Sequence, residues 1–182
     1  MELLNKTKAS GDDRRQDNAD RVDLFPKENH PHAAAYYKDD WSFVTDTAIR
    51  ENIAYQLQYI EFLVKLYNGY QIYLTVESLL CKTIMVTIAG IIECALFDSV
   101  EQASTKANFN IGDKRDFITL INFAYDMQYI DRDMKDAFHE LRKIRNFIHL
   151  TAADFQEYKA YTVEETNHYI QILDRFHNVM AG

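Results

Sequence analysis

Apolar side chains recur with the period of an α-helix from residue 46 to the end of the chain. In the first such stretch, the apolar side chains at Ile49, Ile53 and Leu57 begin a stripe that continues to Val64. Polar breaks separate this stretch from four others of the same kind. The pattern predicts five helices, covering approximately residues 46–68, 72–100, 113–127, 131–150 and 162–182.

The predicted helices carry recognisable end signals. Residues suited to cap an N-terminus stand before three of them: Asp46 or Thr47, Asp131, and Thr162 with Glu165 in a capping box. Gly69 follows the first helix, and a glycine at that position can take the left-handed conformation that ends a helix. Five helices joined by short connections favour an up-and-down bundle.

The second predicted helix, residues 72–100, is apolar on most of its faces and is expected to lie at the centre of the bundle. Lys82 and Glu93 interrupt its most apolar part and leave ten uncharged residues between them. A membrane span needs nearer 20 apolar residues, so we expect a buried core helix and no membrane contact. A carboxylate among apolar residues needs a partner, and Glu93 is therefore expected to pair with an arginine.

Residues 1–40 show no helical or strand period. They are predicted to form a polar, partly mobile N-terminal arm in front of a helical-bundle domain at residues 41–182. His30 and His32 flank Pro31 within this arm. They are interpreted as solvated loop histidines and not as metal ligands, because no second pair of ligands lies nearby in the sequence.

Composition agrees with an all-α fold. The 182 residues include only 5 Gly and 2 Pro, too few for the frequent tight turns of a sandwich or barrel. The apolar fraction of 47% is ample for a core. A net charge of −8 disfavours a dedicated duplex-DNA binder, because such proteins need a basic face.

The cellular location is expected to be cytoplasmic. The first 21 residues contain no apolar run of signal-peptide length. Cys81 and Cys94 stand thirteen residues apart in one predicted helix, a separation of roughly 20 Å that no disulfide can bridge. Both are therefore interpreted as reduced core residues.

One group of polar residues in the fourth predicted helix suggests chemistry. Arg142 and His149 are seven residues apart and return within roughly 20° of each other around the helix. Arg145 and Asn146 lie on either side of that line, whereas the apolar side chains of this helix occupy a separate arc. An imidazole can transfer protons near neutral pH, a guanidinium can hold a phosphate through two nitrogens, and an amide can orient either group.

This stretch resembles the HEPN superfamily, helical bundles found in prokaryotic toxins, phage-defence proteins and RNA-processing enzymes. Its signature is an Arg, four to six intervening residues and a His, often with Asn or Asp directly after the Arg. Arg142 has that spacing to His149, whereas Arg145 is followed by Asn146 but stands only three residues before the histidine. The resemblance covers residues 117–150 by motif and residues 46–180 by helix count.

The resemblance implies a metal-independent endoribonuclease of the toxin or defence type that needs no cofactor and acts as a homodimer on RNA, with a site shared by two chains. His149 would be the general acid/base, Arg142 or Arg145 would hold the phosphate, and Asn146 would orient its neighbours. A cognate antitoxin or regulatory protein is an implied partner. A homodimer is also expected because four neighbouring helices leave Ile84 to Ile92 short of cover.

Two alternatives remain open from the sequence. The first is a catalytically silent HEPN-like module that serves in dimerisation or partner binding. The second is a helical accessory to transcription regulation resembling the mannitol operon repressor family, which would not need His149. In either case the polar residues at the end of the fourth helix would cap carbonyls or pair with acids such as Glu140 and Asp154.

Overall fold

The computed structural model describes residues 1–5, 30–107, 116–146 and 160–182. Every regular element in these ranges is a helix, so the predicted all-α fold is confirmed. The described part has one helix more than the sequence pattern predicted. The helices are α1 (Ala34–Asp40), α2 (Thr47–Gly69), α3 (Leu74–Ala107), α4 (Phe117–Asp126), α5 (Arg132–Asn146) and α6 (Val163–Ala181).

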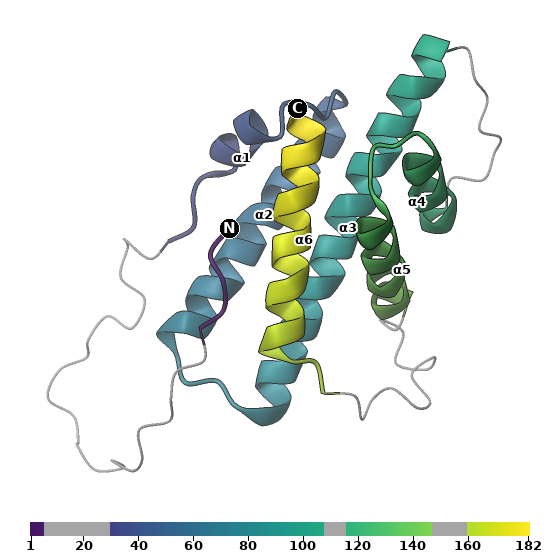
Figure 1. Cartoon of the computed structure of the whole chain (residues 1–182). Coiled ribbons are helices and arrows are strands. Elements are labelled where there is room, and N and C mark those ends of the chain that lie inside the picture. Colours follow the sequence, from purple (N-terminus) through teal and green to yellow (C-terminus); the bar gives the residue numbers. More distant parts are fainter. Residues whose placement is uncertain (6–29, 108–115, 147–159) are drawn as a thin grey trace, which may run out of the picture.

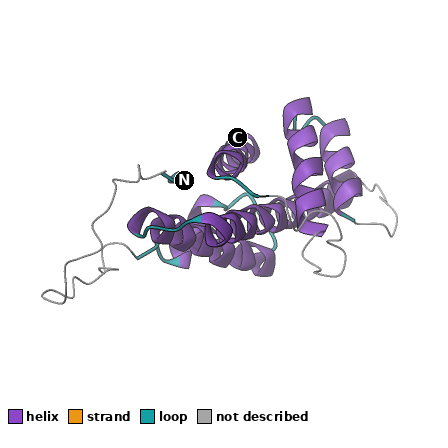
Figure 2. Ribbon diagram, turned by 90° about the horizontal axis from the view of Figure 1, so that it is seen from below, coloured by secondary structure: helices purple, strands orange, loops and turns teal. Residues whose placement is uncertain are grey.

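Helix α3 is the centre of the bundle, as its sequence predicted. It packs against α2, α4, α5 and α6, whereas α1 packs mainly on α2. Figure 1 shows the long helices α2 and α3 with α6 lying across them, and the shorter α4 and α5 beside the far part of α3. The view from below in Figure 2 shows α4 and α5 standing at one end of this layer.

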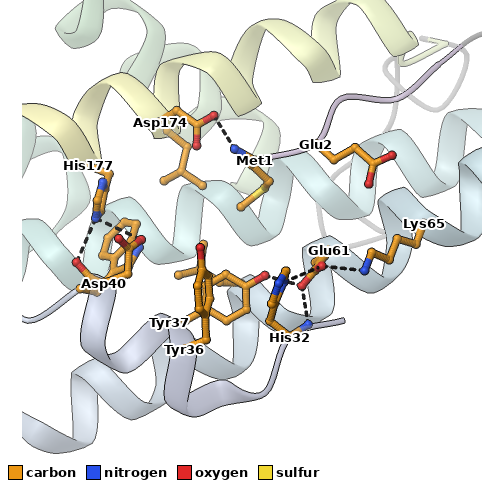
Figure 3. Close-up of a pocket in the computed structure, with 13 residues that line it drawn as sticks. Met1, Glu2, His32, Tyr36, Tyr37, Asp40, Glu61, Lys65, Asp174 and His177 are labelled. Atoms are coloured by element: carbon orange, nitrogen blue, oxygen red, sulfur yellow. Dashed lines mark hydrogen bonds and ion pairs between the residues drawn. The ribbon is translucent and has the colours of Figure 1, made fainter. Parts of the chain in front are cut away.

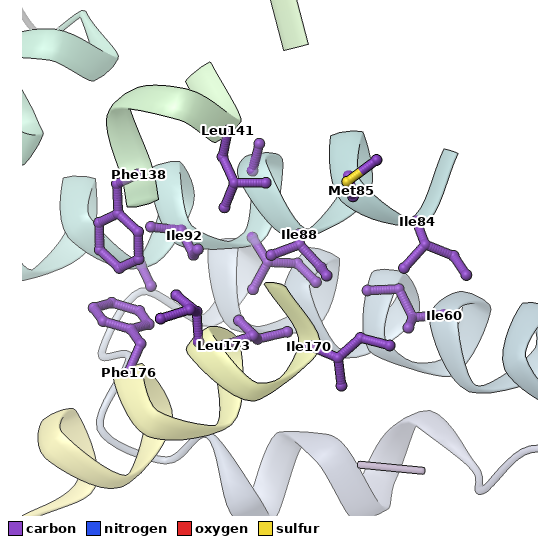
Figure 4. Packing of buried hydrophobic residues seen from close by; sticks show 14 of the residues in the cluster. Ile60, Ile84, Met85, Ile88, Ile92, Phe138, Leu141, Ile170, Leu173 and Phe176 are labelled. Atoms are coloured by element: carbon purple, nitrogen blue, oxygen red, sulfur yellow. The ribbon is translucent and has the colours of Figure 1, made fainter. Parts of the chain in front are cut away.

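The core lies between α2, α3, α5 and α6 (Figure 4). Phe138 of α5 and Phe176 of α6 meet edge to face, with ring centroids 5.4 Å apart. The isoleucines of α3 between Ile84 and Ile92 are fully buried by the chain itself. The expected lack of cover for the stretch from Ile84 to Ile92 is therefore wrong for these isoleucines. In the same stretch, Val86, Thr87 and Gly90 stay partly exposed.

Three of the predicted caps are confirmed. The carboxylate of Asp46 accepts hydrogen bonds from the first backbone amides of α2 at 2.8 and 2.9 Å. Asp131 accepts from the amide of Met134 at 3.0 Å, and Thr162 forms the capping box with Glu165. The left-handed cap at Gly69 is wrong. Helix α2 continues through Gly69 and ends against Tyr70, whose backbone is extended.

Helix α1 lies inside the stretch that was expected to be a polar arm. It has seven residues, of which only Tyr37 is buried, so it is too short to show a helical period in the sequence. Residues 1–5 also pack on the bundle. Leu4 is 3% exposed, and its backbone amide donates to the side chain of Asn167 on α6 at 2.9 Å. The packed part of the chain thus reaches N-terminal of the boundary expected at residue 40.

Polar contacts at both ends set the register of the antiparallel pair α2 and α3. Near the start of α2, the buried carboxylate of Asp98 accepts from the amides of Thr45 at 2.8 Å and Asp46 at 2.9 Å. Near its end, the hydroxyl of Tyr67 donates to Glu77 at 2.8 Å. In an antiparallel pair, each step forward along one helix meets a step backward along the other, so the sum of two paired residue numbers stays constant. The sums for these contacts are nearly equal, and α2 and α3 therefore keep one register along their length.

A segment of α3, Leu74–Thr105, is long and apolar enough to cross a membrane by length and composition alone. Half of its most apolar window is buried inside the structure. A core helix of a bundle has the same properties, and the packing of α3 against four neighbours accounts for its apolar character.

Candidate functional site

The structure places the polar residues predicted on the fourth helix at the C-terminal end of α5. Met134, Phe138, Leu141 and Ile144 are buried, as the separate apolar arc required. Arg142 and Arg145 are half-buried and Asn146 is exposed in the last turn. These three predicted site residues are brought together. His149 and Asp154 lie outside the described residues.

Arg145 is held by a carboxylate from the centre of the bundle. Its two terminal nitrogens lie 2.7 and 3.1 Å from the two carboxylate oxygens of Glu93 on α3. The side chains of Arg145 and Glu93 are 37% and 21% exposed. Burial raises the pKa of Glu93, and the guanidinium of Arg145 offsets part of that rise. The expectation that Glu93 pairs with an arginine is therefore confirmed.

Arg142 lies one turn before Arg145 and is less well satisfied. Its Nε is buried and has no hydrogen-bond acceptor among the described residues. A buried donor without an acceptor costs free energy, so the surroundings of Arg142 are incomplete in this part of the chain. Burial lowers the pKa of the neighbouring His139, and the charge of Arg142 lowers it further.

The positive charge at this end of α5 is partly neutralised within the chain. Lys143 pairs with Glu140 at 2.6 Å on the surface, and Arg145 pairs with Glu93. Three of the four residues from Arg142 to Arg145 are cationic, but two of them have acidic partners. The excess positive charge is therefore smaller than the sequence alone suggests.

A second polar cluster, which sequence reasoning missed, lies between α1, α2 and α6 (Figure 3). Its centre is Glu61 of α2, 7% exposed. The carboxylate accepts from the hydroxyl of Tyr37 at 2.5 Å and from the backbone amide of His32 at 2.7 Å. The His32 ring nitrogen Nδ1 and the ammonium of Lys65 each lie 2.9 Å from it. Only the i, i+4 spacing of Glu61 and Lys65 was visible in the sequence.

The donors around Glu61 decide its ionisation. Burial raises its pKa, but the hydrogen bonds from Lys65, Tyr37 and the His32 amide outweigh burial and lower the pKa below its usual value. Burial raises the pKa of Tyr37, and the hydrogen bond to Glu61 raises it further. The cluster is therefore an ionised carboxylate held by neutral and cationic donors, an arrangement that anchors α1 to α2.

His177 of α6 forms a separate contact with the C-terminal end of α1. Its Nε2 lies 3.0 Å from the backbone oxygen of Asp40 and 3.3 Å from its carboxylate. The ring packs on Trp41 and Phe43, with centroid separations of 5.2 and 5.7 Å. Asp40 is the last residue of α1, so His177 contacts the C-terminal end of that helix.

Comparison with known proteins adds no relative. No family model, no curated protein and no solved structure matches the chain. Among the described residues, no group of three or more His, Cys, Asp or Glu side chains is arranged to hold a metal ion.

Proposed function

We propose that the protein is a HEPN-like, metal-independent endoribonuclease that acts as a homodimer in the cytoplasm. The observation that carries the proposal is the end of α5. There the Glu93 carboxylate orients Arg145 through two contacts, one turn from the incompletely satisfied Arg142 and shortly before His149. The ion pair holds Arg145 and this end of α5 in place, whereas Arg142, within the described part of the chain, keeps an unused hydrogen-bond donor for an anion.

In the proposed reaction, His149 takes the proton of a ribose 2′-hydroxyl, and the oxygen attacks the adjacent phosphorus. The bond from phosphorus to the 5′-oxygen breaks, that oxygen receives a proton, and a cyclic phosphate end remains. Arg142 binds the phosphate and stabilises its developing charge, because its neighbour Arg145 is already engaged by Glu93. Asn146 orients the imidazole or the phosphate from the exposed last turn of α5.

The surface that we propose for the second chain is the open face of the α2–α3 pair, on the side away from the core. Its exposed residues are Asn52, Tyr55 and Tyr59 on α2 and Leu79 and Thr83 on α3. The stripe continues through partly exposed residues, Phe62 and Leu66 on α2 and Val86, Gly90, Cys94 and Phe97 on α3. No residue of this set is charged, although the chain carries a net charge of −8. The Thr83 hydroxyl donates to the helix backbone at 2.8 Å, so its methyl group is free to face outward. A neutral face lets two acidic chains approach without repulsion.

Gly90 supports close approach at this face. A methyl group added there would meet nothing within 4 Å, so packing within the chain does not require a glycine. Glycine in a helix interior costs roughly 1 kcal/mol relative to alanine. A helix of a second chain that crosses closely at position 90 would explain why a glycine stands there. Glu93 is three residues away, about 4.5 Å along the helix axis, so a two-fold axis near Gly90 brings both motifs close together.

The dimer is tested by Gly90→Leu. The bulky side chain points to solvent in one chain, so the variant is expected to fold but to sediment as a monomer at tens of micromolar, where the wild type sediments as a dimer. Gly90→Ala is the matched control, which is expected to raise the free energy of unfolding by about 0.5–1 kcal/mol. A wild-type monomer, or a Gly90→Leu dimer, would contradict the proposed surface.

The nuclease is tested with purified protein and single-stranded RNA in the presence of a metal chelator. Cleavage that leaves cyclic phosphate ends is expected for the wild type and is expected to fall at least a hundredfold in His149→Ala and Arg142→Ala. The control is Arg132→Ala, which removes a cation from the exposed first turn of the same helix. This variant is expected to cleave RNA as fast as the wild type. RNA left intact by the wild type, or equal cleavage by His149→Ala, would overturn the nuclease.

A second candidate function is a silent HEPN-like dimerisation or partner-binding module. It is favoured by the internal ion pairs of Arg145 and Lys143, which use cations that RNA would otherwise bind. It predicts an intact dimer that leaves RNA uncleaved. A cognate antitoxin or regulatory protein, recovered as a complex of defined composition, would then carry the function.

A further inference from the structure

The cavity between α1, α2 and α6 is lined by no residue of α5, and the proposed nuclease makes no use of it. Its volume is about 320 Å³, at the lower end of the range for small-molecule sites. Figure 3 shows side chains from three helices and from the N-terminal segment pointing into it. Its floor is apolar and formed by Trp41, Leu57 and Leu173, all of which are buried.

The polar lining of this cavity is acidic. Four carboxylates border it, those of Glu2, Asp40, Glu61 and Asp174. The one lysine in the lining, Lys65, directs its ammonium to Glu61 at 2.9 Å and to the carbonyl oxygen of His30 at 2.9 Å. Lys65 is thus paired with Glu61, and the Met1 ammonium, the other cation in the lining, is paired with Asp174. Glu2 and Asp40 are the carboxylates left over, and they make the potential negative. Such a lining repels anions and attracts cations.

The carboxylates differ in how far they are engaged. Glu61 is surrounded by donors from three side chains and one backbone amide. Asp40 and Asp174 instead keep 48% and 42% of their side chains exposed at the mouth. Asp174 is already seen with a cationic partner, because the ammonium group of Met1 lies 3.0 Å from it. A primary ammonium is therefore a group that this corner of the cavity accepts, and a bound cation would take its place.

Aromatic rings also line the cavity. Tyr36 and Tyr37 meet edge to face, with centroids 5.2 Å apart, and the ring of His32 stacks on Tyr36 at 4.6 Å. Tyr36 is 56% exposed and so offers a ring face to a ligand. Aromatic faces attract cations, most strongly where water is partly excluded.

We propose that this cavity is a binding site for a small organic cation, an aliphatic amine with one or two ammonium groups. One ammonium pairs with Asp174, the alkyl chain lies over Leu57 and Leu173, and Tyr36 contributes a cation–π contact. A second ammonium, where present, reaches Asp40. The site is independent of the proposed nuclease, since it uses no residue of α5.

The test is a calorimetric titration of the full chain with 1,4-diaminobutane at a constant ionic strength of about 0.15 M. Saturable binding of one diamine per chain is expected. Asp174→Asn keeps the shape of the side chain and is expected to weaken binding at least about tenfold by removing one ion pair. Tyr36→Ala is expected to weaken it about two- to fivefold.

The matched control is Glu164→Gln, which removes one negative charge from the same helix ten residues away, about 15 Å along its axis. It is expected to leave diamine binding unchanged. Three results would overturn the proposal. They are the absence of saturation up to about 10 mM diamine, equal weakening by Glu164→Gln and Asp174→Asn, and tighter binding of inorganic phosphate than of the diamine. RNA cleavage by the same variants is read separately and bears only on the nuclease.

Discussion

Glu61 and Glu93 occupy comparable places on α2 and α3, and the fold treats them in opposite ways. Each is a carboxylate on a central helix with a cationic partner. Glu61 receives donors from Tyr37, Lys65 and His32, and its pKa is lowered. Among the described residues, Glu93 has the guanidinium of Arg145 as its one partner, and its pKa is raised. The number of donors, and not burial alone, decides whether a carboxylate is held firmly in its ionised form.

The difference separates an anchor from a positioning group. Glu61 joins α1 to α2 through contacts that a substitution would leave unsatisfied. Glu93 pairs with Arg145, whose side chain remains 37% exposed, so water can solvate the guanidinium when the Glu93 carboxylate is removed. A carboxylate with a raised pKa beside a partly exposed cation is typical of functional sites, whereas a carboxylate held by several donors is typical of structural networks.

The largest expected effect on the stability of the protein comes from a substitution in the Glu61 cluster. Glu61→Ala leaves the Tyr37 hydroxyl and the His32 amide without their acceptor, and it removes the ion pair of Lys65, whose ammonium keeps the carbonyl oxygen of His30. The free energy of unfolding is expected to fall by about 3 kcal/mol, as for other broken buried ion pairs. Urea denaturation followed by circular dichroism measures it. Tyr37→Phe removes one donor only and is expected to cost about 1 kcal/mol. Equal losses in the two variants would contradict the anchor role.

Glu93→Gln is expected to have a smaller effect on stability and a larger one on function. Because both side chains of the ion pair are partly exposed, the loss in unfolding free energy is expected to be about 1 kcal/mol. Under the proposed function, RNA cleavage falls at least about tenfold, because Arg145 is no longer oriented. Denaturation and cleavage are measured on the same preparation. A loss of stability as large as that of Glu61→Ala would remove the distinction between the two carboxylates.

The pH dependence of stability should differ in sign. A lowered pKa means that Glu61 stabilises the fold above the pH at which it ionises in the unfolded chain. That contribution is lost as the pH falls through its folded value. A raised pKa means that Glu93 contributes most below its unfolded value and loses that contribution as the pH rises through its folded value.

Denaturation of the wild type, Glu61→Gln and Glu93→Gln between about pH 3 and pH 6 tests this contrast. The wild type should gain stability relative to Glu61→Gln as the pH rises through this window. It should lose stability relative to Glu93→Gln over the same window. Parallel curves for the two variants would mean that both carboxylates have the same environment.

Much of the bundle could be predicted because its signals are local. The capping residues Asp46, Asp131 and Thr162 act on backbone amides two to three residues away, so the sequence alone locates the starts of α2, α5 and α6. The need of Glu93 for a cation is also visible, since a carboxylate in an apolar helix must be paired. The clustering of Arg142, Arg145 and Asn146 follows from the helical repeat.

Tertiary structure alone decided which groups met across the bundle. Glu61 and Tyr37 are 24 residues apart and belong to different helices, and His177 reaches Asp40 across 137 residues. Helix α1 exists because Tyr37 is buried against α2, and its seven residues are too few for propensity to predict. Periodicity reports which face of a helix is apolar. It contains no information about which neighbour covers that face, so the cover over Ile84 to Ile92 and the open face at Gly90 emerged only from the packing.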